Sequence, residues 1–189
     1  MDAIKTEPSG KAFVDQVEEM SHSNISRCWH CLICSGGCPF SEDMDYLPNQ
    51  IIRMTQLGFK EEALASSTIW LCVGCHTCSM ECPNSIDVAA IMDALRQIAI
   101  AENREIGEPG ILSFHQAVLD SIFQYGRAHK LGIMMKYKWA EKNLFSDIDL
   151  GLKMFFRRKL DIAPSKVTDK KKIRSLFQTK GGRHEKNSR

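Results

Sequence analysis

Apolar residues recur every three or four positions along much of the chain, which is the spacing of one face of a helix. Helices are therefore expected over residues 48–57, 60–66, 86–99 and 111–125. Pro48 suits the first turn of the first helix, and Gly58 is expected to end it. Asn84 or Ser85 is expected to cap the third helix, and Gly107 with the Pro-Gly pair after it is expected to end that helix. Since no convincing two-residue alternation marks a strand pair, the predicted fold class is mainly α.

The two ends of the chain differ in character. Phe13, Val17 and Met20 indicate a short N-terminal helix that docks on another part of the protein. Short helices are also expected at 131–144 and 150–160, whereas the residues after Pro164 are mostly Lys, Arg, Ser and Gly. We therefore expect an N-terminal docking segment (1–20), a helical ferredoxin-type domain (21–106), a C-terminal helical extension (107–163) and a basic tail (164–189) that is flexible or ordered by a partner.

The charge is divided unevenly, although the formal total is only +2. Residues 1–152 hold 20 acidic and 12 basic residues, whereas residues 153–189 hold 3 acidic and 13 basic ones. The basic tail is expected to dock on an acidic partner or to be simply solvated. No signal peptide and no run of 18 apolar residues is visible, so a cytoplasmic location without a transmembrane segment is expected.

Eight cysteines form two groups of identical spacing. Each group has cysteines at relative positions 1, 4, 7 and 11, followed by proline, and the two groups begin 44 residues apart. We call residues 28–39 the first cysteine loop and residues 72–83 the second cysteine loop. The cysteines are Cys28, Cys31, Cys34 and Cys38 in the first loop and Cys72, Cys75, Cys78 and Cys82 in the second.

This spacing predicts two 4Fe–4S clusters, because thiolates are soft ligands and three cysteines three positions apart can wrap one cubane. The fourth cysteine of such a loop ligates the other cluster. One cluster is therefore expected on Cys28, Cys31, Cys34 and Cys82, and the other on Cys72, Cys75, Cys78 and Cys38. The alternative is a pair of structural zinc sites, since zinc also uses paired C-x2-C elements.

Other residues in the loops are expected to support the clusters. His30 and His76 are expected to be supporting or surface groups, because each loop already supplies its cysteines. Trp29 and Trp70 are expected to pack over the clusters. The chain has no glycine-rich nucleotide motif and no credible nucleophile–base pair, so no catalytic residue is predicted.

The cysteine loops carry a family resemblance. The stretch from Cys28 to Pro39, the Ile-Trp-Leu lead-in to Cys72 and the closing Cys82-Pro83 resemble the C subunit of heterodisulfide reductase, an alpha-helical ferredoxin. The resemblance covers roughly Val14 to Tyr125. It implies a non-catalytic component of an oxidoreductase complex in anaerobic metabolism. That component relays electrons from an electron-bifurcating A subunit, which contains flavin and iron–sulfur clusters, to a disulfide-reducing B subunit. This chain lacks the Cys-Cys-Gly motif of the B subunit, so the disulfide chemistry is expected on another polypeptide.

Two other functions stay open at this stage. The double cysteine motif is shared with the iron–sulfur subunits of succinate and glycerol-3-phosphate dehydrogenases, which are membrane-associated. A redox-responsive protein that binds nucleic acid through the basic tail is the other alternative. The terminal acceptor, the reduction potentials, the stoichiometry of the complex and the role of the tail do not follow from the sequence.

Overall fold

The computed structural model describes residues 8–140, 167 and 169–177, and every regular element within them is a helix. The mainly α prediction is therefore confirmed. The chain divides into two compact units, Met1–Pro109 and Gly110–Arg189, and each is described here by itself.

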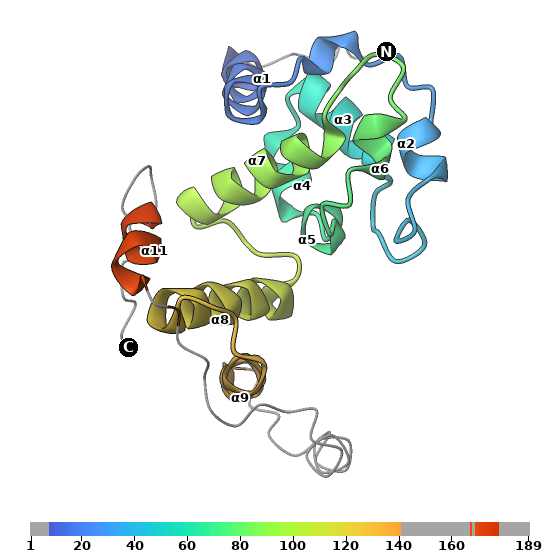
Figure 1. Cartoon of the computed structure of the whole chain (residues 1–189). Coiled ribbons are helices and arrows are strands. Elements are labelled where there is room, and N and C mark those ends of the chain that lie inside the picture. Colours follow the sequence, from blue (N-terminus) through green and yellow to red (C-terminus); the bar gives the residue numbers. More distant parts are fainter. Residues whose placement is uncertain (1–7, 141–166, 168, 178–189) are drawn as a thin grey trace. The chain divides into compact units, whose positions relative to one another are not determined.

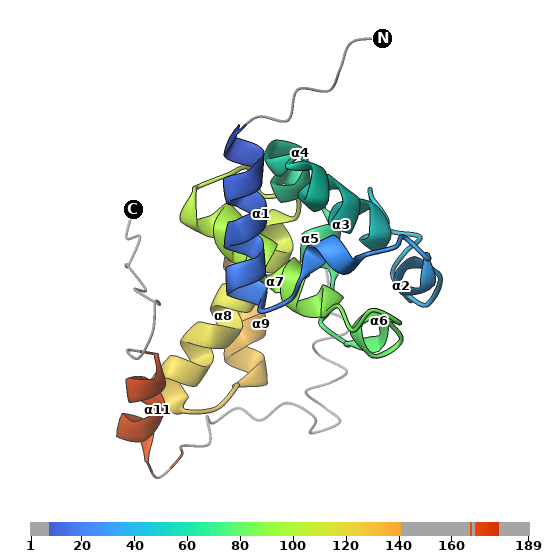
Figure 2. The ribbon, with the colours of Figure 1, turned by 90° about the horizontal axis from the view of Figure 1, so that it is seen from above.

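Helix α7 (Val88–Ala101) is the centre of the first unit, where helices α1 (Pro8–Ser21) and α4 (Lys60–Ala65) pack against it (Figures 1 and 2). Its side chains Ile91, Leu95 and Ala99 have no solvent-exposed surface. Burial of an isoleucine or leucine side chain stabilises a fold by about 1.5–3 kcal/mol. Phe13 and Val17 of α1 are buried in this unit as well, whereas Met20, which was expected on the same apolar face, is 40% exposed.

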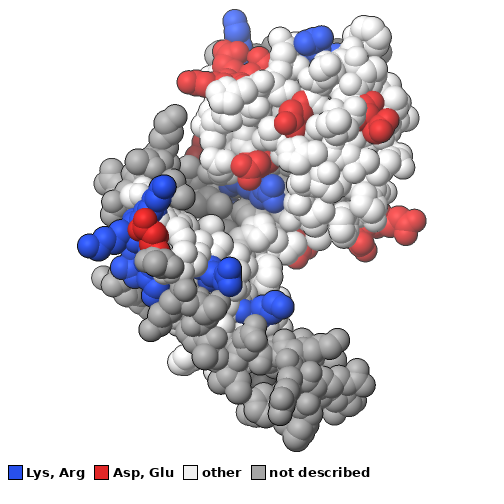
Figure 3. All heavy atoms as spheres, viewed as in Figure 1, with Lys and Arg blue, Asp and Glu red and all other residues white. Residues whose placement is uncertain are grey.

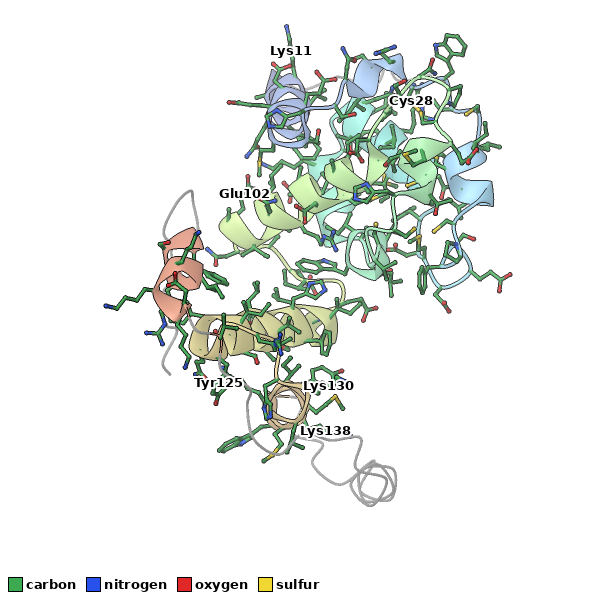
Figure 4. The ribbon with its side chains drawn as sticks, in the orientation of Figure 1. Lys11, Cys28, Glu102, Tyr125, Lys130 and Lys138 are labelled. Atoms are coloured by element: carbon green, nitrogen blue, oxygen red, sulfur yellow. The ribbon has the colours of Figure 1, made fainter. Side chains whose placement is uncertain are left out.

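Helix α3 (Pro48–Leu57) starts and stops where the sequence predicts. Its C-cap, Gly58, has a left-handed φ of 76°, and a Cβ there would lie 2.5 Å from the Cα of Gly10. Both observations require glycine at position 58, where the chain passes closest to α1. The helix that follows, α4, carries Lys60, whose Nζ lies 2.5 Å from the Glu102 carboxylate just beyond the end of α7 (Figure 4).

The predicted ends of α7 are wrong at both termini. The N-cap is Asp87, whose carboxylate accepts a hydrogen bond from the Ala90 N–H at 3.0 Å, and Ser85 instead has a left-handed φ of 53°. The helix ends at Ala101 rather than near Gly107, because Asn103 turns the chain with a φ of 52°. The sequence pattern missed the start of the helix because apolar Ile86 lies just before it and extends the periodicity.

Short helices flank both cysteine loops. A 3-10 turn, η1 (Ile25–Arg27), leads into the first loop, and α2 (Ile33–Gly36) lies within it. Helix α5 (Thr68–Leu71) leads into the second loop, and α6 (Thr77–Met80) lies within that one. Helices α2 and α6 contact each other, so the two loops lie side by side (Figure 2).

The second unit contains α8 (Pro109–Tyr125), α9 (Lys130–Ala140) and α11 (Lys170–Leu176). The rings of Phe114 and Tyr137 join α8 to α9 edge to face, with centroids 5.7 Å apart. Phe123 of α8 makes the same kind of contact with Phe177, next to α11. Helix α11 lies within the tail that the sequence suggested is flexible or ordered by a partner, and the predicted helix at 150–160 lies outside the described residues.

Part of the basic segment 153–189 can be seen on the surface. On the face drawn in Figure 3, acidic side chains are spread over the first unit, and lysines and arginines gather around the strongly basic helix α11. In the part of the chain that the structure describes, no helix is long and apolar enough to cross a membrane.

Candidate iron–sulfur site

The two cysteine loops repeat each other in backbone conformation as well as in spacing. His30 and Gly74, which are equivalent, have left-handed φ values of 55° and 63°. The next equivalent pair, Leu32 and His76, have φ values of 67° and 59°, and each begins the short helix inside its loop. Left-handed conformations cost free energy at residues other than glycine and concentrate at ligand-binding sites. The shared path therefore indicates one ligand-binding turn used twice.

A serine anchors each loop to the helix that follows it. The Ser35 hydroxyl donates to Asn49 Oδ1 at 2.6 Å and accepts the Asn49 backbone N–H at 3.1 Å, at the start of α3. The Ser79 hydroxyl donates to the Asp87 carboxylate at 2.7 Å and accepts the Ala89 N–H at 3.2 Å, at the start of α7. Neither serine was predicted from the sequence, although their identical position one residue after the third cysteine could have identified them.

Each loop is also held at its entrance by an acidic side chain. Glu18 of α1 accepts the backbone N–H of Ile25 at 2.7 Å, which fixes η1 before the first loop. Asp45 accepts the backbone N–H groups of Ser67 at 2.9 Å and Thr68 at 3.0 Å, which fixes α5 before the second loop. Glu18 acts over seven residues, whereas Asp45 joins segments 22 and 23 residues apart, and neither contact was predicted.

Asp45 is bound more extensively than Glu18. Its carboxylate also accepts hydrogen bonds from the hydroxyls of Ser66 and Thr68, both at 2.7 Å. Partial burial raises the pKa of Asp45, but these hydrogen bonds outweigh it and hold the pKa well below its usual range. Asp45 is therefore ionised at neutral pH and links the end of the first loop to the start of the second.

Two cavities of similar size open among the cysteines. The first cavity is lined by Cys28, Cys31, Cys34 and Cys82, and the second cavity by Cys38, Cys72, Cys75 and Cys78. Each is thus lined by three cysteines of one loop and the last cysteine of the other. Figure 4 labels Cys28, which directly follows η1.

The rest of the cavity walls is largely apolar. Ile52 and Ile86 line the first cavity, Phe40 and Met92 line the second, and Val88 lines both. Apolar walls exclude water, and the degree of solvent access is one of the factors that tune iron–sulfur centres.

The thiols influence one another across the two loops. Burial is the largest effect on Cys78 and raises its pKa to about 11, and the charges of Cys72, Cys34 and Cys75 add to the rise. Burial likewise raises the pKa of Cys72, and the charge of Cys38 adds to this rise. Half-buried thiols that disfavour ionisation when crowded together fit a site in which a cationic centre compensates the thiolate charges.

A single metal ion fits the residues less well than a cluster. Zinc draws its four ligands to about 2.0–2.3 Å from one point. Among the described residues, no three His, Cys, Asp or Glu side chains converge on such a point. A cubane instead places each thiolate on a different iron, so its four cysteines surround a cavity, and four cysteines line each of the two cavities. The donor set therefore fits an iron–sulfur cluster.

The tryptophans and histidines in and beside the two loops differ in burial and in their partners. Trp29 lines the first cavity but is 78% exposed, whereas Trp70 is buried in α5. The His30 Nε2 lies 2.9 Å from Gln56 Oε1, and the His76 Nδ1 lies 3.6 Å from the Asp87 carboxylate. Both histidines therefore have polar partners of their own within the fold.

Comparisons with known proteins agree with this site. The family model for a 4Fe-4S dicluster domain matches residues 24–86. The C subunit of H(2):CoB-CoM heterodisulfide,ferredoxin reductase from Methanothermobacter marburgensis is 28% identical over 89 residues, which are 47% of this chain and 48% of that protein. The chain thus matches about half the length of that relative.

Two other relatives are matched over more of their length. The second iron-sulfur C subunit of CoB--CoM heterodisulfide reductase from Methanocaldococcus jannaschii is 27% identical over 79% of this chain and 86% of that protein. The C subunit of Ferredoxin/F(420)H(2)-dependent CoB-CoM heterodisulfide reductase from Methanosarcina acetivorans is 30% identical over 64% of this chain and 71% of that protein. The matched cysteine domain and this coverage show that the chain belongs to the family of iron–sulfur proteins formed by the C subunits of heterodisulfide reductases.

Proposed function

We propose that this chain is the electron-transfer subunit of a heterodisulfide reductase-type complex and holds two 4Fe–4S clusters. The observation that carries the proposal is the pair of cavities, each lined by three cysteines of one loop and one of the other. The four cysteines of the first cavity would hold one cluster, and the four of the second cavity would hold the other. A bound 4Fe–4S cluster supplies one-electron storage.

The protein's own residues position these groups and control access to them. The exchanged cysteines, Cys38 and Cys82, join the two loops, so that neither site is complete without the other. The contact between α2 and α6 keeps the sites adjacent, which favours electron transfer between them. The apolar walls restrict water at both sites.

The proposed partners are an A-like flavoprotein, which donates electrons, and a B-like catalytic protein, which reduces the disulfide. The family to which the chain belongs supports this arrangement, and the chain itself contains no Cys-Cys-Gly motif for disulfide chemistry. The complex is proposed to be cytoplasmic, where cysteines remain reduced as thiols.

Anaerobic purification of the full chain with its co-purifying proteins tests the proposal. We expect about eight irons and eight acid-labile sulfides per chain, together with a flavoprotein and a Cys-Cys-Gly protein. Zinc without sulfide would overturn the cluster assignment. A chain that purified alone and reduced a disulfide rapidly with an artificial electron donor would overturn the electron-transfer role.

A further inference from the structure

Helices α3 and α7 present different side chains at equivalent places behind the two loops. The second residue of each helix, Asn49 or Ala89, donates its backbone N–H to the serine of its loop. Seven residues further along, two helical turns on the same face, lie Gln56 and Arg96. At equivalent positions of the two helices, α3 therefore has a neutral amide and α7 has a cation.

Both side chains reach back to the entrance of their own loop. Gln56 Nε2 donates to the carbonyl oxygen of Ile25 at 2.8 Å, in the turn that precedes Cys28. Arg96 Nη1 donates to the carbonyl oxygen of Cys72 at 3.0 Å. The two acceptors differ by three positions in the repeat, because Ile25 is equivalent to Ile69 and Cys72 to Cys28. Of the two side chains, only Arg96 brings a permanent positive charge to its loop.

The charge of Arg96 is poorly screened by solvent. Its side chain is 13% exposed, and Nε is buried without a hydrogen-bond partner among the described residues. The nearest acidic partner, Asp93, lies 3.5 Å from Nη2 but is 58% exposed. Because this partly buried guanidinium donates to the Cys72 carbonyl oxygen at 3.0 Å, it acts electrostatically on the lining of the second cavity.

Other charges near the loops are more exposed to water. Asp87 lies beside the second loop, but its side chain is 45% exposed and paired with His76. Near the first loop, Arg27 and Arg53 are both exposed. Solvent screens exposed charges much more strongly than buried ones. Arg96 is therefore the cation expected to distinguish the two sites.

We propose that Arg96 sets the order of the two reduction potentials, so that the site of the second cavity is reduced before the site of the first. This inference rests on the proposed function, namely that each cavity holds a 4Fe–4S cluster. Reduction adds one electron from the donor flavoprotein, with no proton taken up and no bond made or broken, so the site gains one negative charge. A buried cation nearby favours that state. Electron transfer from the first cavity to the second is then downhill.

An EPR-monitored redox titration of the anaerobically loaded full chain tests this order. Two reduction waves are expected in the unmodified protein. In Arg96→Gln the higher-potential wave should move to lower potential and the other should stay in place, whereas Arg96→Lys should keep most of the original position. Arg104→Gln is the matched control, because it removes an arginine that lies beyond the C-terminal end of α7 and pairs with Glu61 and Glu102 instead of a cysteine loop.

The reverse substitution provides a second test. Gln56→Arg should raise the lower-potential wave and narrow the gap between the two waves, even if Arg96→Gln fails to fold. The inference is wrong if Arg96→Gln moves the lower wave or neither wave, or if Gln56→Arg leaves the gap unchanged. Iron and sulfide content, measured in the same samples, distinguishes a failure of this inference from a failure of the proposed function. Absence of clusters from the unmodified chain would overturn the proposed function itself.

Discussion

The two cysteine loops have the same spacing and the same left-handed turns, yet the side chains around them differ. The first loop is backed by neutral Gln56 and anchored to Asn49, whereas the second is backed by Arg96 and anchored to Asp87. Local spacing determines what each loop can bind, because three thiolates must reach one cubane. The second layer of side chains determines how alike the two sites are. A repeated motif therefore does not imply two equivalent sites.

Exchange of the fourth cysteine is the feature whose loss should have the largest effect. In Cys38→Ser we expect loss or distortion of the cluster in the second cavity, because Cys38 lines that cavity. The EPR spectrum of the reduced variant should therefore resemble that of Cys75→Ser. Cys31→Ser, at the first cavity, is the matched control. A Cys38→Ser spectrum that matched Cys31→Ser instead would show that each loop keeps its own four cysteines.

The acidic anchors at the two loop entrances should differ in strength. Asp45→Asn should lower the free energy of unfolding by about 2 kcal/mol, because hydrogen bonds to a charged group contribute about 1.5–3 kcal/mol and Asp45 is partly solvated. Glu18→Gln should lower the free energy of unfolding by less, since Glu18 lacks the two hydroxyl donors that Asp45 has. Thermal unfolding of the cluster-loaded proteins at neutral pH measures both. Equal losses of unfolding free energy in the two variants would mean that the hydroxyls of Ser66 and Thr68 contribute nothing to the stability of the protein.

The pKa of Asp45 gives this anchor a pH dependence. Its folded-state pKa is lowered, so its stabilisation is fully present above the ordinary aspartate pKa near 4 and declines as the pH falls through the folded value. The difference in unfolding free energy between the unmodified chain and Asp45→Asn should therefore be constant from pH 7 to about pH 5 and shrink below pH 4. Urea unfolding of the cluster-free chains, followed by circular dichroism, measures it. A difference that grew on acidification would contradict the sign.

The two serine anchors allow a finer comparison. Ser79→Ala should cost about 1.5 kcal/mol and Ser35→Ala about 1 kcal/mol, because Ser79 donates to a carboxylate and Ser35 to an amide. Thermal unfolding of the cluster-loaded variants measures the difference. If the order were reversed, the charge of Asp87 would not strengthen the second anchor.

The smallest effect is expected within the turn itself. Gly74→Ala should cost about 1 kcal/mol, because its φ of 63° is unfavourable for a residue with a Cβ while nothing lies within 4 Å of that Cβ. Gly36→Ala is the matched control, since that position is equally open but has no left-handed φ. Equal stabilities of the two variants in thermal unfolding would show that the left-handed turn carries no strain.

Much of the fold was predictable, and the misses have physical causes. Helix α3 was predicted at both ends because proline and glycine mark its termini directly. The start of α7 was also hard to predict because the capping residue, Asp87, is held in place by a hydrogen bond from Ser79, eight residues away in another helix. Helix α11 was not anticipated, since its sequence is strongly basic. It contacts α8 through Phe123, with the Arg174 guanidinium 5.2 Å from the centre of that ring.

By itself, the sequence determined the helical class, the ligand type and the 44-residue repeat, because each depends on residues close together in the chain. The cysteine spacing also predicted which four cysteines belong to each site, because the fourth cysteine of such a loop ligates the other cluster. Only the tertiary structure decided which charged groups lie next to each loop. Asp45 reaches α5 across 23 residues, and Arg96 reaches Cys72 across 24. Arg96 is brought to Cys72 by the packing of α5 against α7, which local spacing does not encode.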